Sequence, residues 1–204
     1  MSLELINTLA SLATVVIVAT AAVAAIVQLR HLRSSNQISA ILSIGEQFQS
    51  QEFRDAFSVV RHKLAQTMES PLFREYAACF VRNQPLPEVA AGDEEVRRDA
   101  ILIGNAYEHV GILIKHGVVG RDIFLDRYSG TIIRVWGMLD TFIAFMRDAA
   151  GSELFENFEL LVVYAKKWER EHANSYPRGT PRLKMRNPWP VAPMPTEADR
   201  NSLG

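Results

Sequence analysis

The residues best suited to chemistry lie in one short segment, where Tyr107, Glu108 and His109 are consecutive and His116 follows seven residues later. A histidine beside a carboxylate is a pair that could bind a metal ion or transfer a proton. Helices that bind metals more often place two histidines four residues apart, or use Glu-x-x-His. His116 also falls in the last turn of a predicted helix, where a partly charged imidazole suits the helix dipole. We therefore predict no metal site here.

Glu108 stands between two glycines, with Gly104 four residues before it and Gly111 three after it. On a helix these three residues share one ridge, and two glycines there are offset by close packing of another helix. Arg134 lies on a later predicted helix between two apolar neighbours. We predict a candidate buried polar cluster of Tyr107, Glu108, His109 and Arg134, in which a Glu108–Arg134 pair orients the helices. The alternative is that both charges reach solvent.

The rest of the chain offers no motif for catalysis. It contains no His-Glu-x-x-His, no Gly-x-Ser-x-Gly and no phosphate-binding loop. Cys79 is the only cysteine and lies in a helical, partly apolar stretch, so we expect a packed side chain rather than a nucleophile. We name no catalytic residue, no metal ligand and no cofactor, and an enzyme stays as the less favoured alternative.

The elements that would position these residues are helices, because apolar residues recur at intervals of three and four and no stretch alternates like a strand. Ser50 and Ser70 are predicted N-caps, the second followed by Pro71. Asp93 is predicted to cap a helix that reaches His116 and ends at Gly117. Further helices are predicted over 122–148 and from about residue 154 to His172, after a break at Gly151.

The stretch from Leu5 to Leu29 dominates the amino-terminal end. Its twenty-five residues carry no formal charge, and as a helix they would extend about 37 Å. This length exceeds the hydrocarbon core of a bilayer, about 30 Å. We predict one transmembrane helix. No Gly or Pro interrupts residues 28–33, and the helix continues to about Phe48.

A cleaved signal peptide is the alternative to an anchor, because Ala22-Val23-Ala24 resembles a cleavage site. A signal peptide has a basic segment before its apolar core, whereas Glu4 is the only charged side chain before this one. The apolar run is also longer than the about 7–15 residues usual in signal peptides. These features favour the anchor.

The flanks of the span predict its orientation. Arg30, His31 and Arg33 follow it directly, and positive residues stay on the cytoplasmic side. We predict a membrane protein with its amino terminus outside and its domain in the cytoplasm. The single cysteine suits that reducing compartment.

Three parts are predicted: an anchor with its basic flank over 1–33, a cytoplasmic helical bundle over 34–173, and a proline-rich tail over 174–204. The fold class is all-α, with the transmembrane helix continuing into an antiparallel bundle. Lys and Arg number 17 against 20 Asp and Glu over 30–173, a net charge of −3, and 5 against 2 in the tail, a net charge of +3. Neither value suggests nucleic-acid binding.

The tail is expected to be disordered, since it holds six prolines between Pro177 and Pro195. Its basic cluster consists of Arg178, Arg182, Lys184 and Arg186, followed by Trp189. Such a cluster could contact anionic lipid at the cytoplasmic leaflet, while a proline-rich segment serves equally as the extended ligand of a partner protein.

Small residues four apart in the span, such as Ala21 and Ala25, would let two membrane helices approach closely. Because alanine also fills membrane helices without any partner, the pattern leaves a homo-oligomer and a monomer equally open.

The order of certain short segments resembles a known family. These segments are Gln28-Leu29-Arg30-His31-Leu32-Arg33, Glu52-Phe53-Arg54, the run from Tyr107 to Leu113, and Arg134-Val135-Trp136. The chain from about Leu9 to Trp168 is similar to an uncharacterised bacterial family with one amino-terminal membrane helix and a small helical domain of unknown function. The resemblance implies an inner-membrane protein without an established activity, carries no functional residue over, and leaves the tail outside the family.

Two functions follow from the sequence. The favoured one is a membrane-tethered helical module that binds an unknown protein partner and acts as a scaffold. The alternative is an enzyme or ligand sensor with a pocket inside the bundle around Glu108 and Arg134. A cavity of a few hundred Å³ lined by those residues would favour the second.

Overall fold

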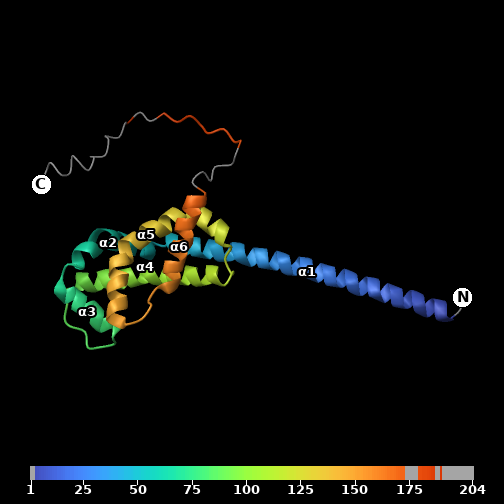
Figure 1. Ribbon diagram of the computed structural model, residues 1–204, viewed down its shortest axis with the longest axis horizontal. Coiled ribbons are helices and arrows are strands. Elements are labelled where there is room, and N and C mark those ends of the chain that lie inside the picture. Colours follow the sequence, from blue (N-terminus) through green and yellow to red (C-terminus); the bar gives the residue numbers. More distant parts are fainter. Residues whose placement is uncertain (1–2, 173–178, 187–188, 190–204) are drawn as a thin grey trace. The chain divides into compact units, whose positions relative to one another are not determined.

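The computed structural model describes residues 3–172, 179–186 and 189, which form six α-helices and no strand (Figure 1). The chain divides into two units, Met1–Ala173 and Asn174–Gly204. All six helices belong to the first unit. The all-α prediction is confirmed for these residues.

Helix α1 runs from Leu3 to Gln49 without a break. Its described side chains up to Asn36 are exposed to solvent, and it is long and apolar enough to cross a membrane by length and composition. Beyond that point one face packs on the other helices, formed by Gln37, Ala40, Ile41, Ile44, Gly45 and Phe48. The spacing of three and four residues between these positions is that of one helical face.

Two short helices follow, and the predicted caps begin both. Helix α2 spans Gln51–Thr67, and the Ser50 side chain accepts a hydrogen bond from the Phe53 amide at 3.2 Å. Helix α3 spans Pro71–Val81, and the Ser70 side chain accepts from the Phe73 amide at 3.3 Å. Each serine satisfies an amide that the first helical turn leaves without a backbone partner.

Helix α4, Ala91–Lys115, starts two residues before the predicted cap. Ala90 is its N-cap residue and makes no side-chain hydrogen bond, while Asp93 lies in the first turn. The prediction that Asp93 caps α4 was therefore wrong. The carboxylate still favours the helix start, because a negative charge in the first turn interacts favourably with the helix dipole. At the other end Gly117 has φ +66°, as expected for a residue just past a helix.

Helices α5, Arg121–Ala150, and α6, Glu156–Glu171, form a hairpin. Gly151 ends α5 in the left-handed conformation with φ +63°. The buried face of α5 contains the predicted positions, namely Ile132, Val135, Leu139, Phe142, Ile143 and Met146, whereas Trp136 is half-buried. Helix α4 lies at the centre, packed against α2 on one side and α6 on the other.

The two glycines of α4 mark its closest approach to α6 and the loop before it. A Cβ on Gly104 would lie 2.8 Å from the Phe155 ring, and one on Gly111 would overlap the backbone carbonyl of Asn157. The predicted close packing along this ridge is confirmed. Any larger side chain at Gly111 must displace backbone, whereas at Gly104 it meets only a ring that can turn.

Substitution of Gly111 by alanine tests this ridge. We expect Gly111→Ala to lower the free energy of unfolding by about 1–3 kcal/mol through overpacking. The measurement is thermal or urea unfolding of the full chain, followed by circular dichroism.

Gly137 on α5 supplies the matched control, because a Cβ there meets nothing within 4 Å. Gly137→Ala should stabilise the protein by about 0.5–1 kcal/mol, the ordinary gain from removing a glycine inside a helix. Equal effects at the two glycines would show that Gly111 is not a close contact.

Candidate functional site

Glu108 joins α4 to the first turn of α6. Its carboxylate accepts a hydrogen bond from the Asn157 side-chain amide at 2.6 Å and another from the Phe158 backbone amide at 2.8 Å. Phe158 is the third residue of α6, so this amide has no partner within its own helix. A negative charge here also interacts favourably with the helix dipole. Glu108 is therefore a cap supplied by a different helix.

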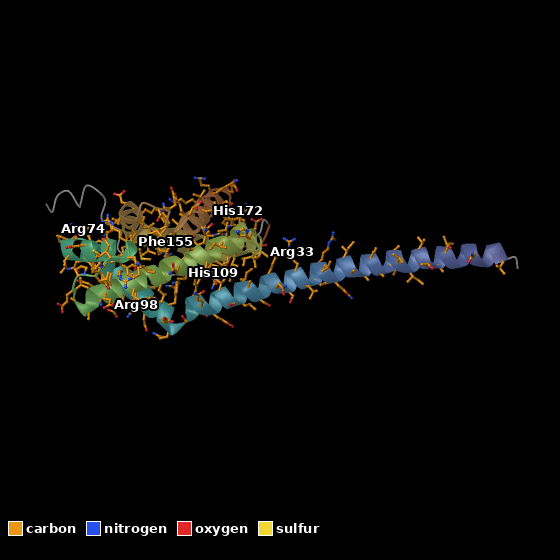
Figure 2. All side chains as sticks on the ribbon, turned by 90° about the horizontal axis from the view of Figure 1, so that it is seen from below. Arg33, Arg74, Arg98, His109, Phe155 and His172 are labelled. Atoms are coloured by element: carbon orange, nitrogen blue, oxygen red, sulfur yellow. The ribbon has the colours of Figure 1, made fainter. Side chains whose placement is uncertain are left out.

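The predicted buried cluster is not formed. Arg134 and His109 are exposed, Glu108 is half-buried and Tyr107 is fully buried. The expected Glu108–Arg134 pair was wrong, because α5 turns Ile132 and Val135 inward and thereby turns Arg134 to solvent. Figure 2 shows His109 on the surface of α4. Only the half-burial of Glu108 and the burial of Tyr107 agree with the prediction.

The loop before α6 needs support from other helices. Phe155, the N-cap residue, has φ +59° and no side-chain cap hydrogen bond. A residue that carries a Cβ adopts this left-handed conformation only at a cost in free energy. Arg147 of α5 compensates by donating to the Leu154 carbonyl at 2.7 Å and to the Glu159 carboxylate at 2.7 Å. Glu108 and Arg147 thus fix the start of α6 from two sides.

A groove of about 500 Å³ opens where α1, α2, α4 and α5 meet. Ring side chains from all four helices form its wall: Phe48, Phe53, Phe57, Tyr107 and Tyr128. The Phe48 ring lies at the centre, with centroids 4.9 Å from Tyr107 and 5.7 Å from Tyr128. Tyr107 stacks on Phe158 of α6 on its other side, at 4.9 Å. The aromatic contacts therefore connect α1 through α4 to α6.

The polar groups of this groove are two phenols, two guanidiniums and short uncharged side chains. Burial, and secondarily Tyr128, raise the pKa of Tyr107, so its hydroxyl stays a hydrogen-bond donor at neutral pH. Arg54 and Arg127 line the same groove, and no carboxylate does. The sequence analysis identified Tyr107 but did not identify this groove.

Arg97 is a second feature that sequence reasoning missed. It is 8% exposed, and its guanidinium lies 3.9 Å from the centre of the Phe80 ring and 5.3 Å from that of Tyr76. Its Nε atom has no hydrogen-bond partner among the described residues. The spacing of Tyr76 and Phe80, four apart on one face of α3, was the available signal. The contact holds α3 against α4 and is structural.

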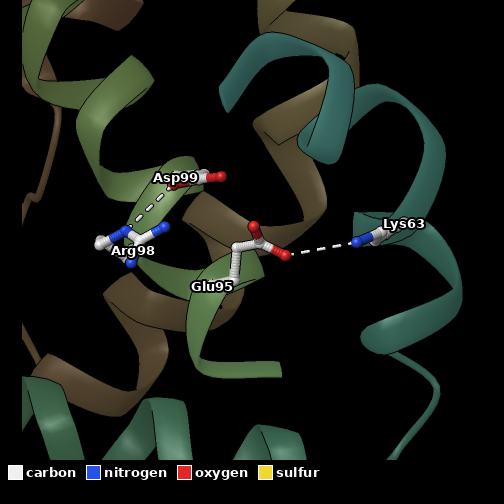
Figure 3. A network of polar contacts seen from close by, with 4 residues as sticks. All are labelled: Lys63, Glu95, Arg98 and Asp99. Carbon is white, nitrogen blue, oxygen red and sulfur yellow. Dashed lines mark hydrogen bonds and ion pairs between the residues drawn. The ribbon is translucent and has the colours of Figure 1, made fainter. Parts of the chain in front are cut away.

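Figure 3 shows a polar network between α2 and α4. Lys63 and Glu95 form an ion pair of 3.3 Å, and Arg98 and Asp99 form one of 3.2 Å. Burial raises the pKa of Asp99, while its hydrogen bond with Arg98 opposes that rise. Asp99 already has its partner, so the network explains how α2 and α4 join rather than offering free chemistry. No group of three or more His, Cys, Asp or Glu within the described ranges could hold a metal ion.

The predicted anchor flank, Arg30, His31 and Arg33, is exposed on α1. The turn between α4 and α5 lies alongside it: a Cβ on Gly117 would be 3.9 Å from an Arg33 guanidinium nitrogen, and one on Gly120 3.9 Å from the Gln37 side-chain oxygen. In Figure 2, Arg33 lies at the end of the bundle from which α1 projects. Thus α1 leaves the bundle at its basic flank.

The predicted tail cluster is described only in part. Arg182, Lys184, Arg186 and Trp189 are exposed, and Arg178 lies outside the described residues. These residues belong to the second unit of the chain.

Comparison with known proteins gives one match. The family described as "Domain of unknown function (DUF4760)" matches residues 15–168, which include most of α1 and all of α2 to α5. No curated protein and no solved structure matches the chain. The resemblance to a domain of unknown function is confirmed, and bacterial origin and a single membrane anchor remain predictions.

Glu108→Ala tests the capping role. We expect a loss of about 1–3 kcal/mol in the free energy of unfolding, because the Phe158 amide would lose a charge-assisted partner. Urea unfolding of the full chain provides the measurement. Arg134→Ala is the paired variant and should change stability by less than about 0.5 kcal/mol, as for exposed residues generally. Equal losses of stability in the two variants would indicate that Glu108 and Arg134 form a pair after all.

Proposed function

We propose a function from the premise that the chain belongs to the family of domains of unknown function DUF4760. The proposed role is that of a membrane-tethered helical module that presents an interaction surface to a partner protein. The observation that carries this proposal is the continuity of α1. One uninterrupted helix has an exposed apolar part, long enough to span a bilayer, and a later part packed in the domain core.

The proposed location is the inner membrane of a bacterium, with the amino terminus outside and the bundle in the cytoplasm. The basic flank supports this orientation, because Arg30 and Arg33 are exposed directly after the apolar stretch. A signal sequence near the amino terminus can meet the same criteria of helix length and apolar composition. The packing of residues 37–48 against the other helices argues for retention, since the same helix supplies core residues.

The proposed partner surface lies at the opposite end of the bundle. Leu72 on α3 and Leu86 in the following loop are exposed, and Phe80 between them is 41% exposed. In Figure 1, α3 lies at the end of the bundle away from the projecting part of α1. We take these exposed apolar side chains, carried by α3 and the loop after it, as the candidate contact points for a partner. A partner would therefore be held at a fixed distance from the anchor.

A second function, ligand sensing, has one observation in its favour. The pocket expected around Glu108 and Arg134 is replaced by the aromatic groove, which Tyr107 lines and to which α1 contributes Phe48. A ligand bound there would contact the helix that carries the apolar stretch. The enzyme form of this alternative has no catalytic group placed in the groove beyond the two phenols.

Two further contacts are proposed from the sequence alone. Arg182, Lys184, Arg186 and Trp189 would contact anionic lipid, at about 1 kcal/mol per basic residue close to the leaflet. Ala21 and Ala25 would form the face of a homo-oligomer. Vesicle binding by a 176–195 peptide tests the first, and membrane dimerisation of an Ala21→Leu, Ala25→Leu variant tests the second. A peptide that binds no anionic vesicle, or dimerisation unaffected by the leucines, would remove the corresponding contact.

Orientation is tested by a reporter fused after Gly204. We expect activity only from a reporter that works in the cytoplasm, because the basic flank retains that end of the span inside. Cells that express the fusion are assayed with cytoplasmic and periplasmic reporters in parallel. Periplasmic activity, or a soluble product cut near Ala24, would disprove the anchor.

The partner surface is tested by a photo-crosslinking amino acid at position 72 in the full chain in native membranes. We expect a discrete crosslinked product that disappears when Leu86→Glu is added, since a charge at that place opposes an apolar contact. Position 163 is the matched control, because Val163 is also exposed but lies on α6. The same product from both positions, or none from position 72, would contradict the proposed surface.

A further inference from the structure

We infer that the aromatic groove binds a small amphipathic anion, with an apolar body against the wall of rings and one anionic group at the arginines. The inference rests on the groove alone and goes beyond the interaction function proposed above. Its volume of about 500 Å³ falls within the range of ligand pockets, about 300–1,000 Å³.

The walls specify the apolar body. Phe48 stacks nearly parallel to both Phe53 and Tyr107, with interplanar angles of 29° and centroid distances of 5.0 and 4.9 Å. Tyr128 meets Phe48 edge-on, at 87°. The rings pack on one another at these distances, so together they form one aromatic wall of the groove rather than a slot between two rings. An apolar ligand group that lies against this wall gains contact with it.

The charges specify the anion. Two arginines, Arg54 and Arg127, are the only side chains lining the groove that are charged at neutral pH, and they come from different helices. Arg54 donates one hydrogen bond to Gln51 and keeps further donors of its guanidinium. Arg127 lies 5.8 Å from the centre of the Tyr128 ring. A cationic ligand would be repelled by the two guanidiniums, and a neutral ligand would gain no charge–charge attraction from them.

Tyr107 supplies a polar group at the groove. Its side chain is 1% exposed and lines the groove. A ligand oxygen that reaches the phenol would accept a hydrogen bond from it.

Gly45 gives access to the groove. A Cβ on this residue would lie 3.4 Å from the Tyr128 hydroxyl, so a longer side chain must extend into the space. Gly45 and Phe48 belong to α1, whereas Tyr128 and Arg127 belong to α5. A bound anion would therefore join the end of α1 to α5.

The experiment uses the purified full chain in a neutral sugar detergent, with 2-naphthoate as the probe and 2-naphthamide as its uncharged analogue. Binding is measured by equilibrium dialysis against protein-free micelles. We expect saturable binding of the naphthoate, weaker binding of the amide, and loss of about tenfold or more in affinity for Gly45→Leu, whose side chain fills the groove. Gly137→Leu, where a Cβ meets no atom within 4 Å, should bind like the parent.

Two milder variants test the arginine and the phenol of the site separately, and both keep the packing of the rings. Arg127→Gln should weaken naphthoate binding by about fivefold and leave the amide unchanged. Tyr107→Phe should weaken both probes. Absence of saturable binding, equal affinity for the two probes, or affinity unaffected by both Gly45→Leu and Arg127→Gln would overturn the inference. A groove that receives a partner's side chain would bind neither probe, which is the first of these outcomes.

Discussion

The start of α6 depends on one carboxylate from another helix. Glu108 accepts from Asn157 and from the Phe158 amide, and it does so because Gly104 and Gly111 let the loop and the first turn of α6 approach α4. Without Glu108, the Phe158 amide in the first turn of α6 would lose its acceptor, while the Arg147 bonds to the Leu154 carbonyl and the Glu159 carboxylate would remain. The close approach of α6 to α4 and the capping by Glu108 are thus one constraint, because the carboxylate reaches the Phe158 amide only when the two helices lie this close.

The position of the aromatic residues follows from this constraint. Phe158 is both the residue whose amide Glu108 caps and the residue whose ring stacks on Tyr107. Tyr107 in turn stacks on Phe48, so fixing the first turn of α6 also fixes the ring against which α1 ends. The groove lies at the end of this series of ring contacts, where Phe48 of α1 packs on Tyr107. Its shape is therefore determined by a contact on the other side of α4.

The sequence predicted local features well and the partners of polar side chains poorly. Ser50, Ser70, Gly117 and the Gly104–Gly111 ridge were identified because each depends on residues within a few positions or on a helical period. The partner of Glu108 was missed because it is a backbone amide fifty residues away, and any residue type carries that amide. Arg134 was placed inside because its neighbours are apolar, yet a half-turn of error in the rotation of α5 separates inside from outside. The groove was not predicted because side chains from four helices form it, and no periodic pattern in the sequence marks such a place.

The continuity of α1 connects the groove to the predicted membrane flank. Gly45 and Phe48 form part of the groove, and Arg33 lies beside the α4–α5 turn on the same helix. No Gly or Pro interrupts α1 between Arg33 and Gly45, and such a helix behaves as a stiff rod, because every turn is joined to the next by hydrogen bonds. The distance from Arg33 to Gly45 is about 18 Å along the axis. A change in the packing of Phe48 therefore displaces Arg33 as well, whereas a flexible linker would isolate the two places. One rigid helix connects the apolar stretch to the core. The groove and the basic flank are therefore parts of the same rigid element.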